Sequence, residues 1–129
     1  MGRYLGVDFG ARRIGLATAD QDIRIASPAV TVGSAELTDW IEKEGPFDII
    51  VVGLPRGLDG AETPQTLAAR RFAAEVLEPL GTEVVLQDEA GTSSVAESRL
   101  RESGRPYRPE QIDAEAAAII LQDYLETLI

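Results

Sequence analysis

A continuous aliphatic run, "FDIIVVGLP" at residues 47–55, constrains the fold of this chain more than any other segment. A strand exposed on one face alternates apolar and polar residues, whereas a strand covered on both faces is apolar throughout. The run therefore predicts a central strand that lies parallel to a neighbour. Helices must cover both faces of its sheet, which is the arrangement of an α/β protein.

The segments before this run predict an antiparallel meander of three strands. Residues 3–9 and 13–19 alternate with the period of a strand and are separated by a short turn, so we expect a hairpin. Residues 23–32 are rich in β-branched side chains and predict a third strand. Pro28 lacks a backbone donor, which favours an edge position or an irregular end for this strand.

Helix signals alternate with one further strand in the rest of the chain, because cap residues precede and glycines follow the helical patterns. The expected elements are, in order, a helix over 34–44 capped by Ser34, the strand at 47–55, a helix from Thr63 whose buried side carries Leu67, Phe72, Val76 and Leu80, a strand over 82–89, a helix from Thr92 or Ser93 to Gly104, and a helix from 109 onward. This order predicts one α/β domain over residues 1–129, built on a mixed five-stranded sheet.

The composition limits the chemistry that this domain can perform. The 129 residues include neither cysteine nor histidine, which excludes disulfides, zinc sites built on these residues and histidine-based acid–base catalysis. Catalysis would have to rely on carboxylates, hydroxyls or metal ions. The N-terminal residues lack the pattern of a signal peptide and no apolar run approaches the roughly 20 residues of a membrane span, so we expect a cytoplasmic protein.

The charged residues of the chain give two opposing indications about a nucleic-acid partner. A net charge of -10 disfavours nucleic acid as a partner, since affinity for phosphate backbones comes largely from basic residues. The positive charge, however, consists of 11 arginines and 1 lysine, and arginine is the better bidentate phosphate ligand. A local basic patch on an acidic body is one explanation of this bias, and codon usage is the other.

Asp8 interrupts the apolar residues of the first expected strand. A buried carboxylate without a partner is costly, so a cation or a ligand should lie near it. Two ordinary explanations compete with a functional role: an exposed strand end, or a salt bridge to Arg12 or Arg13.

Other acidic residues lie at the end of a strand and on the last helix. Asp88 and Glu89 end the strand at 82–89, at the edge where ligands of open α/β sheets commonly bind. Asp113 shares an Ala-rich, inward face of the last helix. Taken singly, turn chemistry explains the first pair and the helix dipole explains Asp113.

Carboxylates from two strands and a helix could converge at one corner of the sheet. Such an oxygen-rich site suits Mg²⁺ or Mn²⁺. Two such ions, about 4 Å apart, could activate a water and stabilise the leaving oxygen of a phosphodiester. Gly10 would let the backbone approach a phosphate, and Arg13 could bind it.

Four sequence blocks cover nearly the whole chain: "GVDFGARRIGLATAD", "IIVVGLPRGLDGAE", "QDEAGTSSVAESRL" and "IDAEAAAIILQDYL". Together they resemble the YqgF/RuvX family of Holliday junction resolvases. The resemblance implies a ribonuclease H-like fold and a nuclease that depends on Mg²⁺ or Mn²⁺, with two ions expected. It also implies a link to 5′-end processing of the precursor of 16S ribosomal RNA. Matched block by block, the catalytic and metal-binding acids of the family are Asp8, Glu89 and Asp113.

The resemblance also implies nucleic-acid partners, namely branched DNA or precursor ribosomal RNA. The residues expected to contact phosphate are Gly10, Arg12, Arg13, Thr92, Ser93 and Arg99. A basic crescent is expected from Arg12, Arg13, Arg56, Arg99, Arg101, Arg105 and Arg108. The chain departs from the family pattern at Ala11 and at Ala90–Gly91, which leaves Asp88 as a competitor of Glu89. A homodimer would suit a four-way junction, because such a junction has paired scissile strands.

Two other functions are compatible with these residues. ATPases of the actin and sugar-kinase type also hold phosphates on a strand-Asp-x-Gly turn, but they need a second lobe, and the Gly53-Gly57-Gly60 loop lacks the lysine of a P-loop. That loop is expected to be a mobile flap near the site or a linker. A non-catalytic RNA- or protein-binding module is the other alternative, and the presence of all three acids weighs against it.

Overall fold

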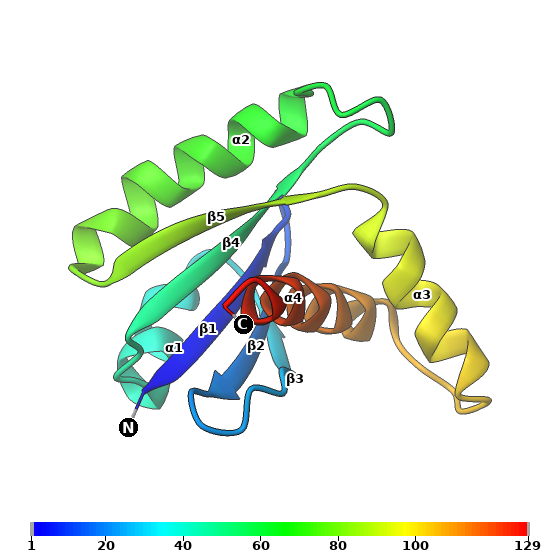
Figure 1. Cartoon of the computed structure of the whole chain (residues 1–129), viewed down its shortest axis with the longest axis horizontal. Coiled ribbons are helices and arrows are strands. Elements are labelled where there is room, and N and C mark those ends of the chain that lie inside the picture. Colours follow the sequence, from blue (N-terminus) through cyan, green and yellow to red (C-terminus); the bar gives the residue numbers. More distant parts are fainter. Residues whose placement is uncertain (1, 129) are drawn as a thin grey trace.

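A mixed five-stranded sheet lies at the centre of the computed structural model, which describes residues 2–128 (Figure 1). The strand order is β3-β2-β1-β4-β5. The strands are β1 (Arg3–Phe9), β2 (Ile14–Asp20), β3 (Ser27–Val32), β4 (Ile49–Pro55) and β5 (Glu83–Glu89). β1, β2 and β3 pair antiparallel, and β4 lies between β1 and β5, parallel to both. The predicted meander and the central aliphatic strand are therefore confirmed.

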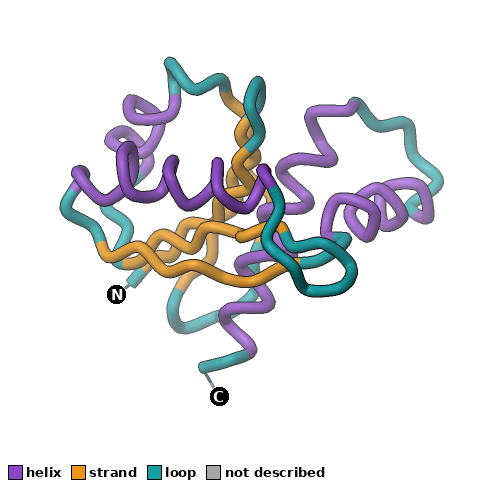
Figure 2. The backbone as a smooth tube through the Cα atoms, turned by 90° about the horizontal axis from the view of Figure 1, so that it is seen from above, coloured by secondary structure: helices purple, strands orange, loops and turns teal. Residues whose placement is uncertain are grey.

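Helices cover both faces of this sheet, as the aliphatic strand requires (Figure 2). The helices are α1 (Leu37–Glu44), α2 (Pro64–Phe72) with its π-helical and 3₁₀ extensions η1 (Ala73–Leu77) and η2 (Glu78–Leu80), α3 (Thr92–Glu102) and α4 (Pro109–Glu126). One core lies between the sheet and α1, α2 and η1, and a second lies between the sheet and α4. α3 packs against α4 through Ala96. No helix within residues 2–128 is long and apolar enough to cross a membrane.

The alternation of each strand decides which residues face α4. In β1, Leu5 and Val7 belong to the core under α1 and α2, so Gly6 and Asp8 point toward the α4 face. The charge of Asp8 is thus directed at the last helix.

Glycines form the surface on which α4 lies. A Cβ added to Gly6 would come within 2.7 Å of the Ala117 carbonyl, and one added to Gly15 would overlap the backbone of Asp113. Gly53 lies equally close to α4. The helix therefore contacts the backbone of three strands, which brings Asp113 down onto the sheet.

Two segments begin later than the sequence predicts. β3 begins at Ser27 rather than at residue 23, because Arg24 adopts a left-handed conformation (φ 61°) that interrupts an extended chain. β3 is nevertheless an edge strand, as Pro28 suggested. α1 begins at Leu37, and Ser34 lies in a preceding turn instead of capping the helix.

The buried side of α2 is also shifted from the prediction. Thr63 caps the helix as expected, but Leu67 and Val76 are 59% and 38% exposed. The side chain of Thr66 donates a hydrogen bond to the Pro55 carbonyl, which turns that position toward the sheet and its neighbour Leu67 away from it. The buried residues are Thr66, Ala69, Phe72, Ala73 and Leu77.

Candidate active site

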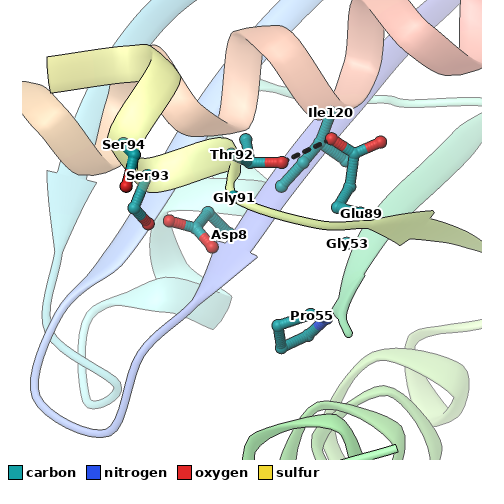
Figure 3. A pocket seen from close by; sticks show the side chains of 9 residues that line it. All are labelled: Asp8, Gly53, Pro55, Glu89, Gly91, Thr92, Ser93, Ser94 and Ile120. Atoms are coloured by element: carbon teal, nitrogen blue, oxygen red, sulfur yellow. Dashed lines mark hydrogen bonds between the residues drawn. The ribbon is translucent and has the colours of Figure 1, made fainter. Parts of the chain in front are cut away.

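Asp8 lies near the carboxyl end of β1 with its side chain in a pocket below α3 and α4 (Figure 3). No ion pair to Asp8 occurs among residues 2–128, so the salt bridge to Arg12 or Arg13 considered from the sequence is not formed. Burial, and secondarily the charge of Asp113, raises the pKa of Asp8 to about 6. The residue is therefore a half-buried acid that forms no ion pair among the described residues.

Asp113 reaches the same corner from the second turn of α4. Its backbone lies over Gly15, which is the antiparallel partner of Asp8 in β2, so the fold places the acid of β1 and the acid of α4 at one corner, on the same face of the sheet. Arg13 approaches Asp113 with 2.8 Å between Nε and Oδ2. This Oδ2 atom nevertheless lacks a hydrogen bond of good geometry among the described residues. Burial raises the pKa of Asp113 despite the opposing effect of Arg13.

The strand register separates the two acids at the end of β5. Glu89 pairs with Pro55, two residues beyond Gly53, and so lies on the α4 face of the sheet. Asp88 lies on the opposite face, where Oδ1 is 3.1 Å from Nη2 of Arg56. Of the two competing acids, Glu89 alone lines the pocket that Asp8 enters.

Glu89 is turned toward the start of α3 rather than toward Asp8 (Figure 3). Thr92 Oγ1 donates a hydrogen bond of 2.6 Å to Glu89 Oε1. Burial raises the pKa of Glu89 to about 7, with a further contribution from Asp123 on α4 that the Thr92 hydrogen bond opposes. The carboxylate is thus held at the wall of the pocket, between α3 and α4.

The pocket that joins these elements has a volume of about 140 Å³. It is lined by Asp8, Gly53, Pro55, Glu89, Gly91, Thr92, Ser93, Ser94 and Ile120. Asp113 lies beside Asp8 but does not line the pocket. Gly91 adopts a left-handed conformation (φ 68°) at the N-cap of α3, which gives the turn after the strand its shape.

The donor atoms at this corner fit a hard divalent cation in kind, although they are not assembled around one. The side chains that could bind the cation are carboxylates, whose oxygens are the ligands that hard cations prefer. Asp8 is in no ion pair among the described residues, and Asp113 Oδ2 lacks a hydrogen bond of good geometry. No three acidic side chains within residues 2–128 are gathered closely enough to form a ready-made metal site. The structure brings Asp8 and Asp113 together and leaves Glu89 on the opposite wall.

The expected phosphate-contacting residues are spread around the pocket mouth. Thr92 and Ser93 line it, and in Figure 3 the hydroxyl of Ser93 points toward Asp8. Gly10 is in the turn after β1, where an added Cβ would lie 2.6 Å from the Arg13 carbonyl. Arg12, in the same turn, is exposed. Arg99 is exposed on α3.

Acidic neighbours offset part of the expected basic crescent. Arg13, Arg56 and Arg101 are in ion pairs with Asp113, with Asp88 and Glu62, and with Glu97. Among the described residues, Arg12, Arg99, Arg105 and Arg108 are in no ion pair and are exposed. The unpaired positive charge is thus carried by the turn after β1, by α3 and by the segment that follows α3.

Two contributors to the site were missed in the sequence. Asp123 raises the pKa of Glu89. The one indication of this residue in the sequence is its position among apolar residues in "LQDYL". Gly15 had a clearer signal, because an isolated glycine inside a strand marks a close backbone approach.

Comparison with known proteins agrees with this fold. The family model described as RuvX, Holliday junction resolvase, matches residues 2–127. A protein of Anaeromyxobacter dehalogenans (strain 2CP-C), named as a candidate pre-16S rRNA nuclease, is 46% identical over 132 residues and the match covers 96% of each chain. A Chloroflexus aggregans protein with the same name is 40% identical over 131 residues, covering 95% of this chain and 92% of its own.

Two solved structures share the arrangement of elements. Thermus thermophilus RuvC in complex with a Holliday junction substrate matches with a TM-score of 0.53 at 18% identity, over 98% of this chain and 95% of its own. The Fowlpox virus resolvase in complex with substrate Holliday junction DNA matches with a TM-score of 0.57 at 10% identity, over 98% and 99%. These likenesses confirm the predicted ribonuclease H-like fold.

Proposed function

Because the chain belongs to the RuvX family of Holliday junction resolvases, we propose that it is a divalent-metal-dependent endonuclease that hydrolyses phosphodiester bonds of structured nucleic acid. The observation that carries this proposal is the half-buried Asp8, which has no ion pair among the described residues, beside Asp113. Two neighbouring carboxylates repel each other and lose solvation, which destabilises the folded state. A bound cation would offset this cost, so such a pair indicates a cation-binding site.

Mg²⁺ or Mn²⁺ is the cofactor that these donors favour, with two ions expected. Asp8 and Asp113 would hold the metal, and Glu89 would provide a further carboxylate. When bound, the metal supplies activation of a water molecule and stabilisation of the charge that develops on the leaving oxygen. Thr92 orients Glu89 through its hydrogen bond, and the exposed Arg12 and Arg99 contribute positive charge for the phosphate backbone.

The substrate proposed is branched DNA, precursor 16S ribosomal RNA, or both, met in the cytoplasm. The names of the relatives support the RNA, and the junction-bound resolvases of the same fold support the DNA. A four-way junction presents two scissile strands, so we propose a homodimer for that substrate. Sedimentation with junction DNA tests this assembly, and a 1:1 complex would contradict it.

The decisive experiment compares the wild-type protein with Asp8→Asn on a four-way junction and on a structured RNA. Each substrate is incubated with Mg²⁺, Mn²⁺ or EDTA. We expect cleavage that requires the metal and that is lost in the variant. Circular dichroism of both proteins checks that the loss is not due to unfolding.

One observation favours a second candidate, a non-catalytic RNA- or protein-binding module. Glu89 is held by Thr92 and does not join the other two acids in a metal-binding group within the described residues. If both proteins bind the substrates and neither cuts under any condition, this second function replaces the first.

A further inference from the structure

The guanidinium of Arg13 lies beside Asp113, where it forms an ion pair with the carboxylate. Its Nε atom lies 2.8 Å from Asp113 Oδ2, the same oxygen that lacks a hydrogen bond of good geometry. The backbone of Asp113 lies over Gly15, the strand partner of Asp8, so the two carboxylates share this corner of the sheet. Within residues 2–128, Arg13 is the one basic residue in an ion pair at this corner. The guanidinium thus neutralises part of an otherwise doubly acidic site.

A purely structural salt bridge does not explain this pair well. The side chain of Arg13 is 45% exposed and that of Asp113 is 20% exposed, so solvent screens the pair from the arginine side, and ion pairs near a protein surface contribute on the order of 0–1 kcal/mol to stability. The position of Asp113 is set by the contact of its backbone with Gly15, so the fold does not depend on the guanidinium. The backbone of Arg13 is packed against Gly10, whereas its side chain is partly exposed and reaches Asp113 with its Nε atom.

We propose that Arg13 is a built-in counter-ion that competes with the divalent cation for Asp113 and is displaced toward the phosphate side of the site when the cation binds. This inference rests on the proposed function for the existence of the cation site. A guanidinium stays charged at all relevant pH values, so it cannot give way by losing a proton. A divalent ion that takes Asp113 Oδ2 must therefore displace Arg13, which is then available to a substrate phosphate.

The first test measures Mn²⁺ binding by calorimetry, without nucleic acid, for wild type, Arg13→Gln and Arg12→Gln. Arg12 is the matched control, because it is the adjacent residue, is exposed and is in no ion pair among the described residues. Removal of a competing ion pair should tighten Mn²⁺ binding about fivefold in Arg13→Gln. Arg12→Gln reports the general effect of losing one nearby positive charge and should change the affinity by less than about twofold. Equal affinities of the two variants would overturn the inference.

The second test follows the displacement itself through the reaction of arginines with phenylglyoxal, mapped by mass spectrometry of peptides. Addition of Mn²⁺ to wild type should increase the modification of Arg13 and leave that of Arg12 unchanged. The Asp113→Asn variant should show the increased modification of Arg13 without Mn²⁺, provided that its circular dichroism is that of the folded protein. The displacement is contradicted if the modification of Arg13 changes neither on addition of Mn²⁺ nor in the Asp113→Asn variant.

The outcomes separate this inference from the nuclease proposal. Tighter Mn²⁺ binding by Arg13→Gln, in a protein that cuts no substrate, supports the counter-ion and rejects the nuclease. Asp8-dependent cleavage with equal Mn²⁺ affinities of the two arginine variants supports the nuclease and rejects the counter-ion. A wild-type protein and an Arg13→Gln variant that both fail to bind Mn²⁺ reject the two together.

Discussion

At the scale of single residues, Asp8 should lower the stability of the protein near neutral pH. Its pKa rises from the ordinary value of 3.8 to about 6 in the folded protein, mainly through burial. The folded state therefore binds a proton more readily than the unfolded state. The contribution of Asp8 is most favourable below pH 4 and is lost as the pH rises through 6, an effect of about 3 kcal/mol.

Asp8→Asn is accordingly expected to be more stable than wild type at pH 7.5 in EDTA, by up to about 3 kcal/mol, and to lose this advantage toward pH 4. Urea denaturation at a series of pH values measures the difference. Asp88→Asn is the control, because Asp88 is exposed and paired with Arg56, and it should not be stabilised. An Asp8→Asn protein that is no more stable than wild type at pH 7.5 would contradict a raised pKa of Asp8 in the folded protein.

Thr92 should hold down the pKa of Glu89. The hydroxyl donates to Glu89 Oε1 and so favours the charged carboxylate, against the effects of burial and of Asp123. Thr92→Val is expected to raise the pKa of Glu89 above about 7 and to move the acidic limb of the cleavage profile to higher pH. Carboxyl carbon shifts in an NMR titration measure the pKa directly. Thr92→Ser keeps the donor and should resemble wild type, so a shift in both variants would contradict this role.

The assignment of Glu89 shows what a sequence can and cannot settle at this scale. The sequence left Asp88 and Glu89 as competitors because a break in the family pattern, Ala90–Gly91, follows them. The register of β5 against β4 separates them, since neighbouring residues of a strand face opposite sides. The direction of the Glu89 side chain depends on Thr92 and Asp123, and no sequence pattern reports such a contact.

At the scale of elements, the seating of α4 on the sheet determines where Asp113 lies. Gly15→Ala would drive a methyl group into the backbone of Asp113. We expect a loss of about 1–3 kcal/mol in the free energy of unfolding and weaker Mn²⁺ binding, because α4 must move away from Asp8. Chemical denaturation and calorimetry measure the two effects.

Gly33→Ala is the matched control for this change, because its added methyl would meet only the end of the flexible Glu36 side chain. It should leave Mn²⁺ binding unchanged. Wild-type Mn²⁺ affinity in Gly15→Ala would show that the position of Asp113 is not set by this contact.

Ion pairs connect the loop after β4, which the sequence predicts to be a mobile flap or a linker, to β5 and α2. Arg56 lies 3.1 Å from Asp88 and 3.4 Å from Glu62, and Arg70 in turn is 3.1 Å from Glu62. Arg56→Gln should speed amide hydrogen exchange at Gly57, whose N–H donates to the Ala61 carbonyl, while global stability changes by less than about 1 kcal/mol.

The control for the loop is Arg70→Gln, which removes only the outer contact to Glu62 and should have a smaller effect on exchange. Hydrogen exchange followed by mass spectrometry over residues 56–62 compares the three proteins. Exchange as slow in Arg56→Gln as in wild type would mean that the backbone alone holds the loop.

Periodicity predicted the elements well and their edges less well. The aliphatic run at 47–55 identified the central strand because burial on both faces leaves a pattern that no other element shares. The face of α2 was predicted only in part, since Phe72 is buried and Leu80 packs against the core, whereas Leu67 and Val76 are exposed. Thr66 occupies a buried position instead and donates a hydrogen bond to the Pro55 carbonyl. The spacing of apolar residues cannot predict that a polar residue occupies a buried position.

At the scale of the whole molecule, a net charge of -10 must be reconciled with a nucleic-acid partner. Exposed arginines without ion pairs among the described residues lie near the site and along α3 and the segment after it. Arg99→Ala is expected to weaken binding to a four-way junction and to reduce the slope of log affinity against log salt by about 1.

Lys43→Ala is the control for this charge effect, because Lys43 lies in the last turn of α1, which covers the face of the sheet opposite to α4. Its salt slope should equal that of wild type. Equal salt slopes for wild type and Arg99→Ala would show that Arg99 on α3 does not contact the nucleic acid.

The contact of α4 with the glycines of β1, β2 and β4 has a consequence for how this protein can change over time. The spacing between the acid of the first strand and the acid of the last helix is supported by main-chain contacts at Gly6 and Gly15, which do not involve the side chains of the surrounding loops. The turn after β1, the loop at 56–62 and the start of α3 surround that spacing without defining it. Substitutions in these peripheral segments are therefore expected to change the surroundings of the two acids more than the spacing between Asp8 and Asp113.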